Sequence, residues 1–388
     1  MSLMVRWVAF LLASLLCAQT PAQRRAPMEK QAEEAIAKGE PNRAVALWQD
    51  ALRVDPQWRA GWWRLGTTLY QAEQPAAARV ALEKLIALDP NAGAPWVVLG
   101  LCEFEMRDYH LASEHLQRGL SLGIPPELDL LDVARYHQAL ALLVSERFEH
   151  AQILLNAFAQ KPDEYQEVVL ASGLAALQLP LLPAVVQRMM DPAQLTLLRD
   201  IGSAQQLVSR RQGPEARKIY EQALTQYPGV PYLHLSYASL LVKLGDSAAA
   251  EAAYRKELEV SPKSILPRLG LGFLAMQSGE VEPAIPLARE AVELEPKSFL
   301  THYLLGAMLL RTGKLDEALQ ALETARLIEP NSSRVRYTLS QVYQRLKRKT
   351  DADRERAAFQ KLKPLEDSFR EFGKLPASLF LQEREDAK

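Results

Sequence analysis

Apolar and polar positions in this chain follow the period of an α-helix. In residues 301–330, apolar side chains recur three and four positions apart in two runs. This spacing places them along one face of a helix, where they can pack against a neighbouring element. Gly313 and Lys314 interrupt the two runs, and Pro330 ends the second because proline cannot continue a helix. The stretch therefore predicts a helix–turn–helix unit.

The same unit recurs with a period of 34 residues. An alanine marks this period in both halves of the chain, at Ala44, Ala78, Ala112, Ala216, Ala250, Ala284, Ala318 and Ala352. A proline stands twelve residues after most of these alanines, at Pro56, Pro90, Pro228, Pro262, Pro296, Pro330 and Pro364. Two markers that keep phase over such a length indicate an array of repeats.

A third marker, twelve residues before the alanine, is always small. Its members are Ala32, Gly66, Gly100, Ala204, Ala238, Gly272, Gly306 and Ser340. Two antiparallel helices approach closely only where the residue at their crossing is small, so we expect these residues at the crossings. Four glycines are expected to end first helices in the left-handed conformation, namely Gly39, Gly245, Gly279 and Gly313.

Several segments resemble the tetratricopeptide-repeat family. First helices read WRLG at 63–66, WVVLG at 96–100 and HYLLG at 302–306. Second helices read AVALWQDALRVDP at 44–56 and ALQALETARLIEP at 318–330. These are similar to the family pattern of W-x2-L-G-x2-Y, A-x3-F and a late proline. The resemblance covers residues 25–366 and implies an all-α fold, a right-handed superhelical solenoid of tetratricopeptide helix–turn–helix repeats.

The period is broken in the middle of the chain. Ala112 and Ala151 are 39 residues apart, and Ala151 and Ala216 are 65 apart. The second gap accommodates one further, compressed unit, so we count ten units. The expected organisation is a signal peptide or N-terminal anchor at 1–22, N-terminal units at 25–131, degenerate units at 132–196, C-terminal units at 197–366 and a capping or flexible tail at 367–388.

The first residues have the layout of a secretory signal peptide. An arginine precedes an apolar run from Trp7 to Leu16, and small residues follow. Ala22 and Ala18 are the two candidate cleavage positions. Lipidation of Cys17 is a less favoured alternative because Leu16 stands where a lipobox has Gly or Ala, and an uncleaved anchor ranks third. We therefore expect an exported protein, periplasmic or envelope-associated.

Charge and composition argue against several classes of function. The formal net charge is −1, so we expect no attraction of the whole chain to nucleic acid or anionic lipid. Two cysteines, and six histidines without an H-E-x-x-H arrangement, predict no metal site. The GLGFLA segment at 270–275 imitates a dinucleotide loop but falls inside a first helix. Because repeats occupy nearly the whole chain, we predict neither a cofactor nor catalytic activity.

The resemblance also implies a ligand-binding face. Ligand-facing residues of the family occupy positions 2, 5, 9, 12 and 13 of each unit, on the first helix. Here they give Trp63, Tyr70, Val97, Phe104, Tyr232, Leu235, Leu266, Leu269, Phe273, Met276, Leu300, Tyr303, Leu310 and Arg311. The alternative is that adjacent units bury many of these side chains. Position 9 has no asparagine, so the family's carboxylate-clamp subtype is not supported.

Three functions are compatible with these features. The leading hypothesis is a non-enzymatic scaffold of the cell envelope that binds peptide or protein partners on its concave surface. The second is a membrane-attached assembly factor, with attachment only through the N-terminus. The third is a glycan-binding accessory subunit of an envelope enzyme complex, for which the tryptophans of the N-terminal half are the candidate platform.

Overall fold

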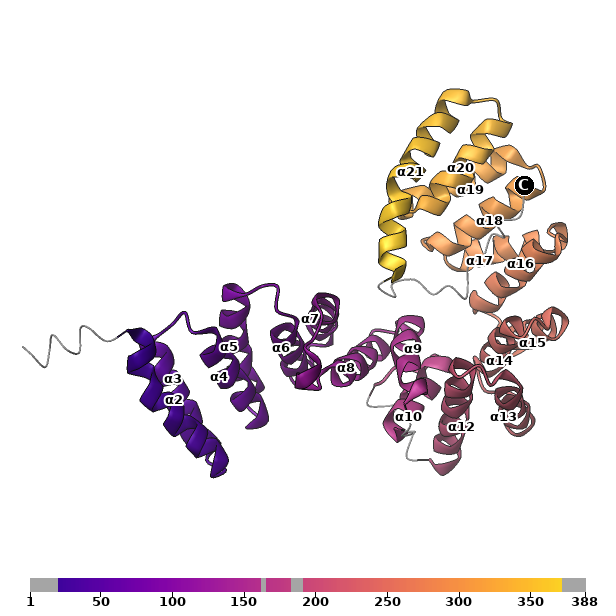
Figure 1. Cartoon of the computed structure of the whole chain (residues 1–388). Helices are drawn as coiled ribbons and strands as arrows, with labels where there is room; N and C mark the ends of the chain where they lie inside the picture. Colours follow the sequence, from indigo (N-terminus) through magenta and orange to yellow (C-terminus); the bar gives the residue numbers. More distant parts are fainter. Residues whose placement is uncertain (1–19, 162–164, 183–190, 372–388) are drawn as a thin grey trace, which may run out of the picture. The chain divides into compact units, whose positions relative to one another are not determined.

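The structure is a computed structural model that describes residues 20–161, 165–182 and 191–371. Every regular element in these residues is helical (Figure 1). The expected signal segment up to residue 19, with Cys17, and the tail from residue 372 lie outside the described residues. The chain divides into two compact units, Met1–Ser145 and Glu146–Lys388, which are considered separately below.

The first compact unit consists of paired helices followed by a single one (Figure 1). Its helices are α2 (Pro21–Ala37), α3 (Pro41–Val54), α4 (Arg59–Gln71), α5 (Pro75–Leu88), α6 (Gly93–Glu105), α7 (Tyr109–Leu122) and α8 (Leu131–Val144), with a 3-10 turn at Pro126–Leu128. The pairs α2–α3, α4–α5 and α6–α7 each form one helix–turn–helix unit, as the period predicts.

The second compact unit continues the same arrangement. Its helices are α9 (Phe148–Asn156), α10 (Gln166–Ala176), α12 (Pro192–Ser209), α13 (Gly213–Gln226), α14 (Leu233–Lys243), α15 (Ser247–Val260), α16 (Leu266–Ser278), α17 (Ile285–Leu294), α18 (Phe299–Arg311), α19 (Leu315–Ile328), α20 (Ser333–Arg345) and α21 (Lys349–Glu371). Two 3-10 turns, Ala157–Gln160 and Glu282–Ala284, adjoin α9 and α17. The all-α tetratricopeptide fold is therefore confirmed, while helix α12 runs through the expected boundary at residues 196 and 197.

A left-handed residue ends the first helix of each repeat. The four glycines expected there do have positive φ angles, between 71° and 86°. The corresponding turns elsewhere place ordinary residues in the same region, at Glu73, Arg107, Glu146, Gln178, Arg211 and Lys347. Together these residues mark ten turns, which agrees with the count of ten units. The turn geometry therefore persists where the sequence has no glycine.

Small residues lie at the helix crossings, as their chemistry predicts. A Cβ atom on Gly66 would lie 2.9 Å from the Leu82 side chain. On Gly306 it would lie 2.5 Å from Leu322 and 3.3 Å from the carbonyl oxygen of Ala318. A larger side chain at either glycine would therefore force the first and second helices of its repeat apart.

One hydrogen bond links successive repeats at four of the closing prolines. The carbonyl oxygen of each of these prolines accepts from a side chain six residues later, on the next first helix. Its partners are Trp62 for Pro56, Trp96 for Pro90, His302 for Pro296 and Arg336 for Pro330, at 2.9–3.0 Å. His302 therefore bonds locally, to the proline carbonyl.

Helices α10 and α12 make the closest backbone contact of the irregular region. A Cβ atom on Gly173 would lie 2.1 Å from the carbonyl oxygen of Leu198, and one on Gly202 would lie 1.9 Å from that of Val169. Beside this contact, Gln206 donates a buried hydrogen bond of 2.8 Å to Ser172. In Figure 1 the two helices lie side by side. The two glycines thus allow α12 to pack directly on α10.

Candidate functional site

The fourteen residues of the predicted binding face differ in burial. Four are buried in the core, namely Val97, Leu235, Leu269 and Leu310. Nine are half-buried, namely Trp63, Tyr70, Phe104, Tyr232, Leu266, Phe273, Met276, Leu300 and Tyr303. Arg311 is exposed. The half-buried residues are the ones that retain surface for a partner, and their role in binding stays a prediction.

Arg311 has a structural contact of its own. Its guanidinium donates a hydrogen bond of 2.9 Å to the carbonyl oxygen of Met276, on the preceding first helix. Arg345, one repeat later, donates in the same way to Leu310 at 2.6 Å. These arginines connect neighbouring first helices, so Arg311 contributes to stacking whether or not it also contacts a ligand.

A concave surface in the second compact unit brings several predicted residues together. This helical groove has a volume of about 180 Å³. It combines faces of α9, α14 and α16 with residues of α10, α12 and α15. The lining consists of Phe148, Glu149, Gln152, Ile153, Asn156, Ala175, Ala176, Gln178, Gln205, Leu235, Ser236, Ser239, Val242, Lys243, Tyr254, Leu266, Gly270 and Phe273. Leu235, Leu266 and Phe273 belong to the predicted face.

The groove has a rigid polar base. The hydroxyl groups of Tyr220 and Ser236 are 2.6 Å apart, and the amide nitrogen of Gln205 donates to both, at 2.6 and 3.1 Å. Burial raises the pKa of Tyr220 to about 12, so its hydroxyl stays protonated and can remain in this network. Because these polar groups satisfy one another, the network fixes α12, α13 and α14 beneath the groove.

Two opposite charges line the helical groove without partners. Glu149 lies at the start of α9, and Lys243 is the last residue of α14. Neither makes an ion pair or a side-chain hydrogen bond within the described residues. Both reach solvent, but nearby protein removes part of their hydration, which raises the pKa of Glu149 and lowers the pKa of Lys243. An opposite charge from a bound molecule would therefore stabilise each of them.

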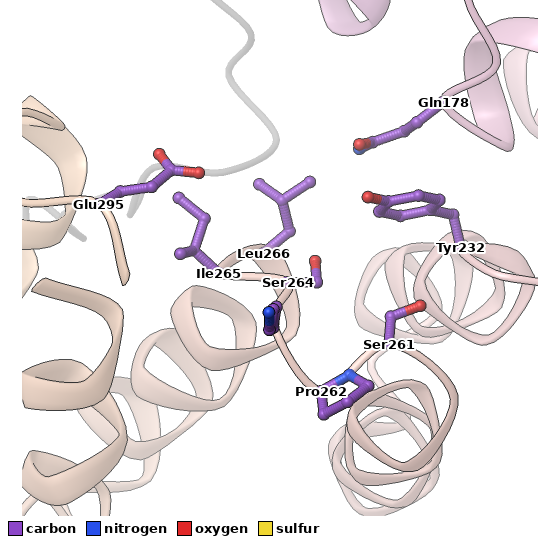
Figure 2. A pocket seen from close by; sticks show the side chains of 9 residues that line it. Gln178, Tyr232, Ser261, Pro262, Ser264, Ile265, Leu266 and Glu295 are labelled. Atoms are coloured by element: carbon purple, nitrogen blue, oxygen red, sulfur yellow. The ribbon is translucent and has the colours of Figure 1, made fainter. Parts of the chain in front are cut away.

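A second depression adjoins the helical groove and shares Gln178 and Leu266 with it. This loop pocket has a volume of about 440 Å³. It is lined by Gln178, Tyr232, Ser261, Pro262, Lys263, Ser264, Ile265, Leu266 and Glu295. Figure 2 shows Ile265 and Leu266 side by side between Glu295 and the polar ends of Gln178 and Tyr232. The two depressions therefore adjoin at Gln178 and Leu266.

Tyr232 owes its position in the loop pocket to a buried carboxylate. Its backbone is left-handed, with φ of 65°, immediately before α14. Glu257, which is 0% exposed, accepts hydrogen bonds from the backbone nitrogens of Tyr232 at 2.7 Å and Leu235 at 3.2 Å. A carboxylate at a helix N-terminus satisfies free N–H groups and interacts favourably with the helix dipole. Glu257 therefore positions both α14 and the Tyr232 ring.

Sequence reasoning missed part of this surface. Lys243 occupies the same repeat position as Arg311, so the pattern that identified Arg311 could have found it. The residues of α9 carried no such signal, because α9 is the second helix of an irregular repeat and the pattern covers first helices only. In the part of the chain that the structure describes, no cluster of His, Cys, Asp or Glu could hold a metal ion. None of the described helices is long and apolar enough to cross a membrane.

Comparisons with known proteins find partial similarity to solved structures. No curated protein matches the chain. Among solved structures, the MamA fragment "41-end" from Desulfovibrio magneticus RS-1 is 19% identical, with 46% of this chain and 98% of that chain covered and a TM-score of 0.42. YrrB, described as a TPR protein with an unusual peptide-binding site, is 19% identical, with 50% and 98% covered and a TM-score of 0.40.

Family profiles match the chain in both compact units. One profile described as tetratricopeptide repeat matches residues 29–93, 64–127 and 202–265, and a second matches residues 275–342. These spans together include more than half of the 388 residues. The chain therefore belongs to the tetratricopeptide-repeat family.

Proposed function

We propose that this protein is a non-enzymatic scaffold that binds a segment of a partner protein in the helical groove. The observation that carries the proposal is the groove itself, in which Phe148, Ile153 and Phe273 offer apolar surface beside two unpaired charges. Tetratricopeptide-repeat proteins are generally scaffolds for protein–protein interaction. An amphipathic or extended peptide suits a surface that combines apolar contacts with a few polar groups.

The tryptophans make glycan binding a weaker candidate. Trp48 is buried, and its ring lies 5.9 Å from that of Trp58, over which the Arg25 guanidinium stacks at 4.0 Å. Trp62 and Trp96 donate their indole N–H groups to proline carbonyls. These side chains already stabilise the repeats, so we favour a protein partner.

Site-specific photo-crosslinking in the source cells tests the proposed groove. A photoreactive phenylalanine analogue at Phe273 is expected to crosslink to a defined set of proteins, because this ring lines the groove. The matched control places the same analogue at Leu327, a 71% exposed residue on the second helix α19. Mass spectrometry identifies the products. Equal products from both positions, or products from Leu327 alone, would refute the groove as the binding surface.

We further propose that the chain is exported and cleaved after Ala18. The Thr20 hydroxyl accepts from the Gln23 backbone, and the Gln23 side chain accepts from the Thr20 nitrogen, forming a capping box for α2. Cleavage after Ala18 keeps this cap, whereas cleavage after Ala22 removes it at a cost of about 1 kcal/mol. The mass of the mature protein is expected to correspond to Gln19 as its first residue. A mass that includes Met1, or a lipid on Cys17, would instead support membrane attachment.

A further inference from the structure

Helix α9 gives the groove an acidic side that the regular repeats do not supply. Phe148, Glu149, Gln152, Ile153 and Asn156 follow helical spacing, so they share one face of this second helix. Gln152 donates to Asn156 at 2.8 Å, while its own side-chain oxygen is buried without a partner within the described residues. Glu149 is therefore the acidic group that this face presents to the groove.

Helix α14 contributes the opposite charge. Leu235, Ser236, Ser239, Val242 and Lys243 also follow helical spacing and form one face, which ends in the ammonium group of Lys243. No ion pair within 4.0 Å joins Lys243 to Glu149 or to any other described residue. The apolar side chains of α16, Leu266 and Phe273, complete the lining.

Building on the proposed function, we propose that the partner segment carries a basic residue for Glu149, an acidic residue for Lys243 and apolar residues that contact Leu266 and Phe273. Charge complementarity then sets the direction in which the segment lies, because the reversed segment would bring like charges together. A like-charge contact is unfavourable, and it is more so in a groove that reduces hydration. The apolar contacts supply affinity, and the two charges supply selectivity.

Both charged side chains reach solvent, but surrounding protein removes part of their hydration. The raised pKa of Glu149 and the lowered pKa of Lys243 have the same cause, the removal of water by surrounding protein. An ion pair in such a place is screened less by solvent than a pair on an open surface.

Parallel selections from a phage-displayed library of short random peptides test the proposal. The baits are the full chain and its Lys243→Glu and Glu149→Lys variants, with Lys218→Glu on helix α13 as the exposed charge-reversal control. Circular dichroism first establishes that all four are folded. Wild type and Lys218→Glu are expected to enrich peptides that combine apolar residues with one acidic and one basic residue. Peptides selected by Lys243→Glu are expected to carry a basic residue in place of the acidic one. Peptides selected by Glu149→Lys are expected to carry an acidic residue in place of the basic one.

The affinity of each protein variant for one synthetic peptide from the wild-type pool is then measured. Binding of this peptide is expected to weaken about tenfold or more with Lys243→Glu and to recover when the acidic residue of the peptide is made basic. If the charge pattern is the same in all pools while Phe273→Asp abolishes binding, the charge proposal fails and the groove stands. If the selected peptides bind Phe273→Asp as tightly as wild type, the groove itself is not the binding surface.

Discussion

Replacing Gly202 by alanine is expected to destabilise the second compact unit by about 1–3 kcal/mol or more. The added Cβ would lie 1.9 Å from the carbonyl oxygen and 2.7 Å from the carbonyl carbon of Val169. These are backbone atoms of α10, which cannot rotate aside as the end of a side chain can. The two helices must therefore separate, and the hydrogen bond between Gln206 and Ser172 is lost with their contact.

Urea unfolding followed by circular dichroism measures this effect, and hydrogen exchange locates it in α10 and α12. Gly229→Ala is the matched control, because a Cβ there would meet nothing within 4 Å and its φ is not positive. The control is expected to change stability by less than about 0.5 kcal/mol. Equal stability of the Gly202 and Gly229 variants would show that α10 and α12 do not pack as closely as described.

Replacing Glu257 by alanine is expected to cost about 2–4 kcal/mol, because two backbone N–H groups lose their charged acceptor. The groups belong to Tyr232 and Leu235, at the start of α14. The left-handed backbone of Tyr232 loses its support at the same time, so the loop pocket is expected to change with the helix. Peptides selected against wild type should therefore bind this variant more weakly, even under conditions where it remains folded.

Two variants separate the cap from a general effect of lost charge. Glu257→Gln retains one side-chain oxygen acceptor and is expected to lose less stability than Glu257→Ala. Glu259, two residues further along α15, is 65% exposed and pairs with Lys256 at 2.9 Å. Glu259→Ala is expected to change the free energy of unfolding by less than about 1 kcal/mol. Similar losses at positions 257 and 259 in urea unfolding would contradict the capping role.

The repeat fold could be predicted because each unit repeats the same packing constraints. Small residues at crossings, such as Gly66 and Gly306, follow from the closeness of two helices. The left-handed turns were predictable only where glycine occupies them. Arg211 and Lys347 adopt the same conformation because the turn and the packing around it outweigh the modest cost for a residue with a side chain.

The irregular middle and the groove could be predicted only in part. Leu266 and Phe273 follow from the family pattern, but the α9 face does not, because no periodic position identifies it. The contact of Gly202 with α10 also depends on how the irregular repeat packs, which is a tertiary property. The opposite charges of Glu149 and Lys243 are far apart in sequence, so only the structure places them in one groove.

The hydrogen bond at the closing proline changes which substitutions count as conservative in this array. The four donors differ in size, charge and hydropathy, yet each donates an N–H group to the proline carbonyl oxygen. They are Trp62, Trp96, His302 and Arg336. These four side chains thus share an N–H donor rather than a residue class. Exchanging Trp62 for arginine is expected to preserve the hydrogen bond between repeats, whereas exchanging it for phenylalanine, a closer match by hydropathy, is expected to remove it.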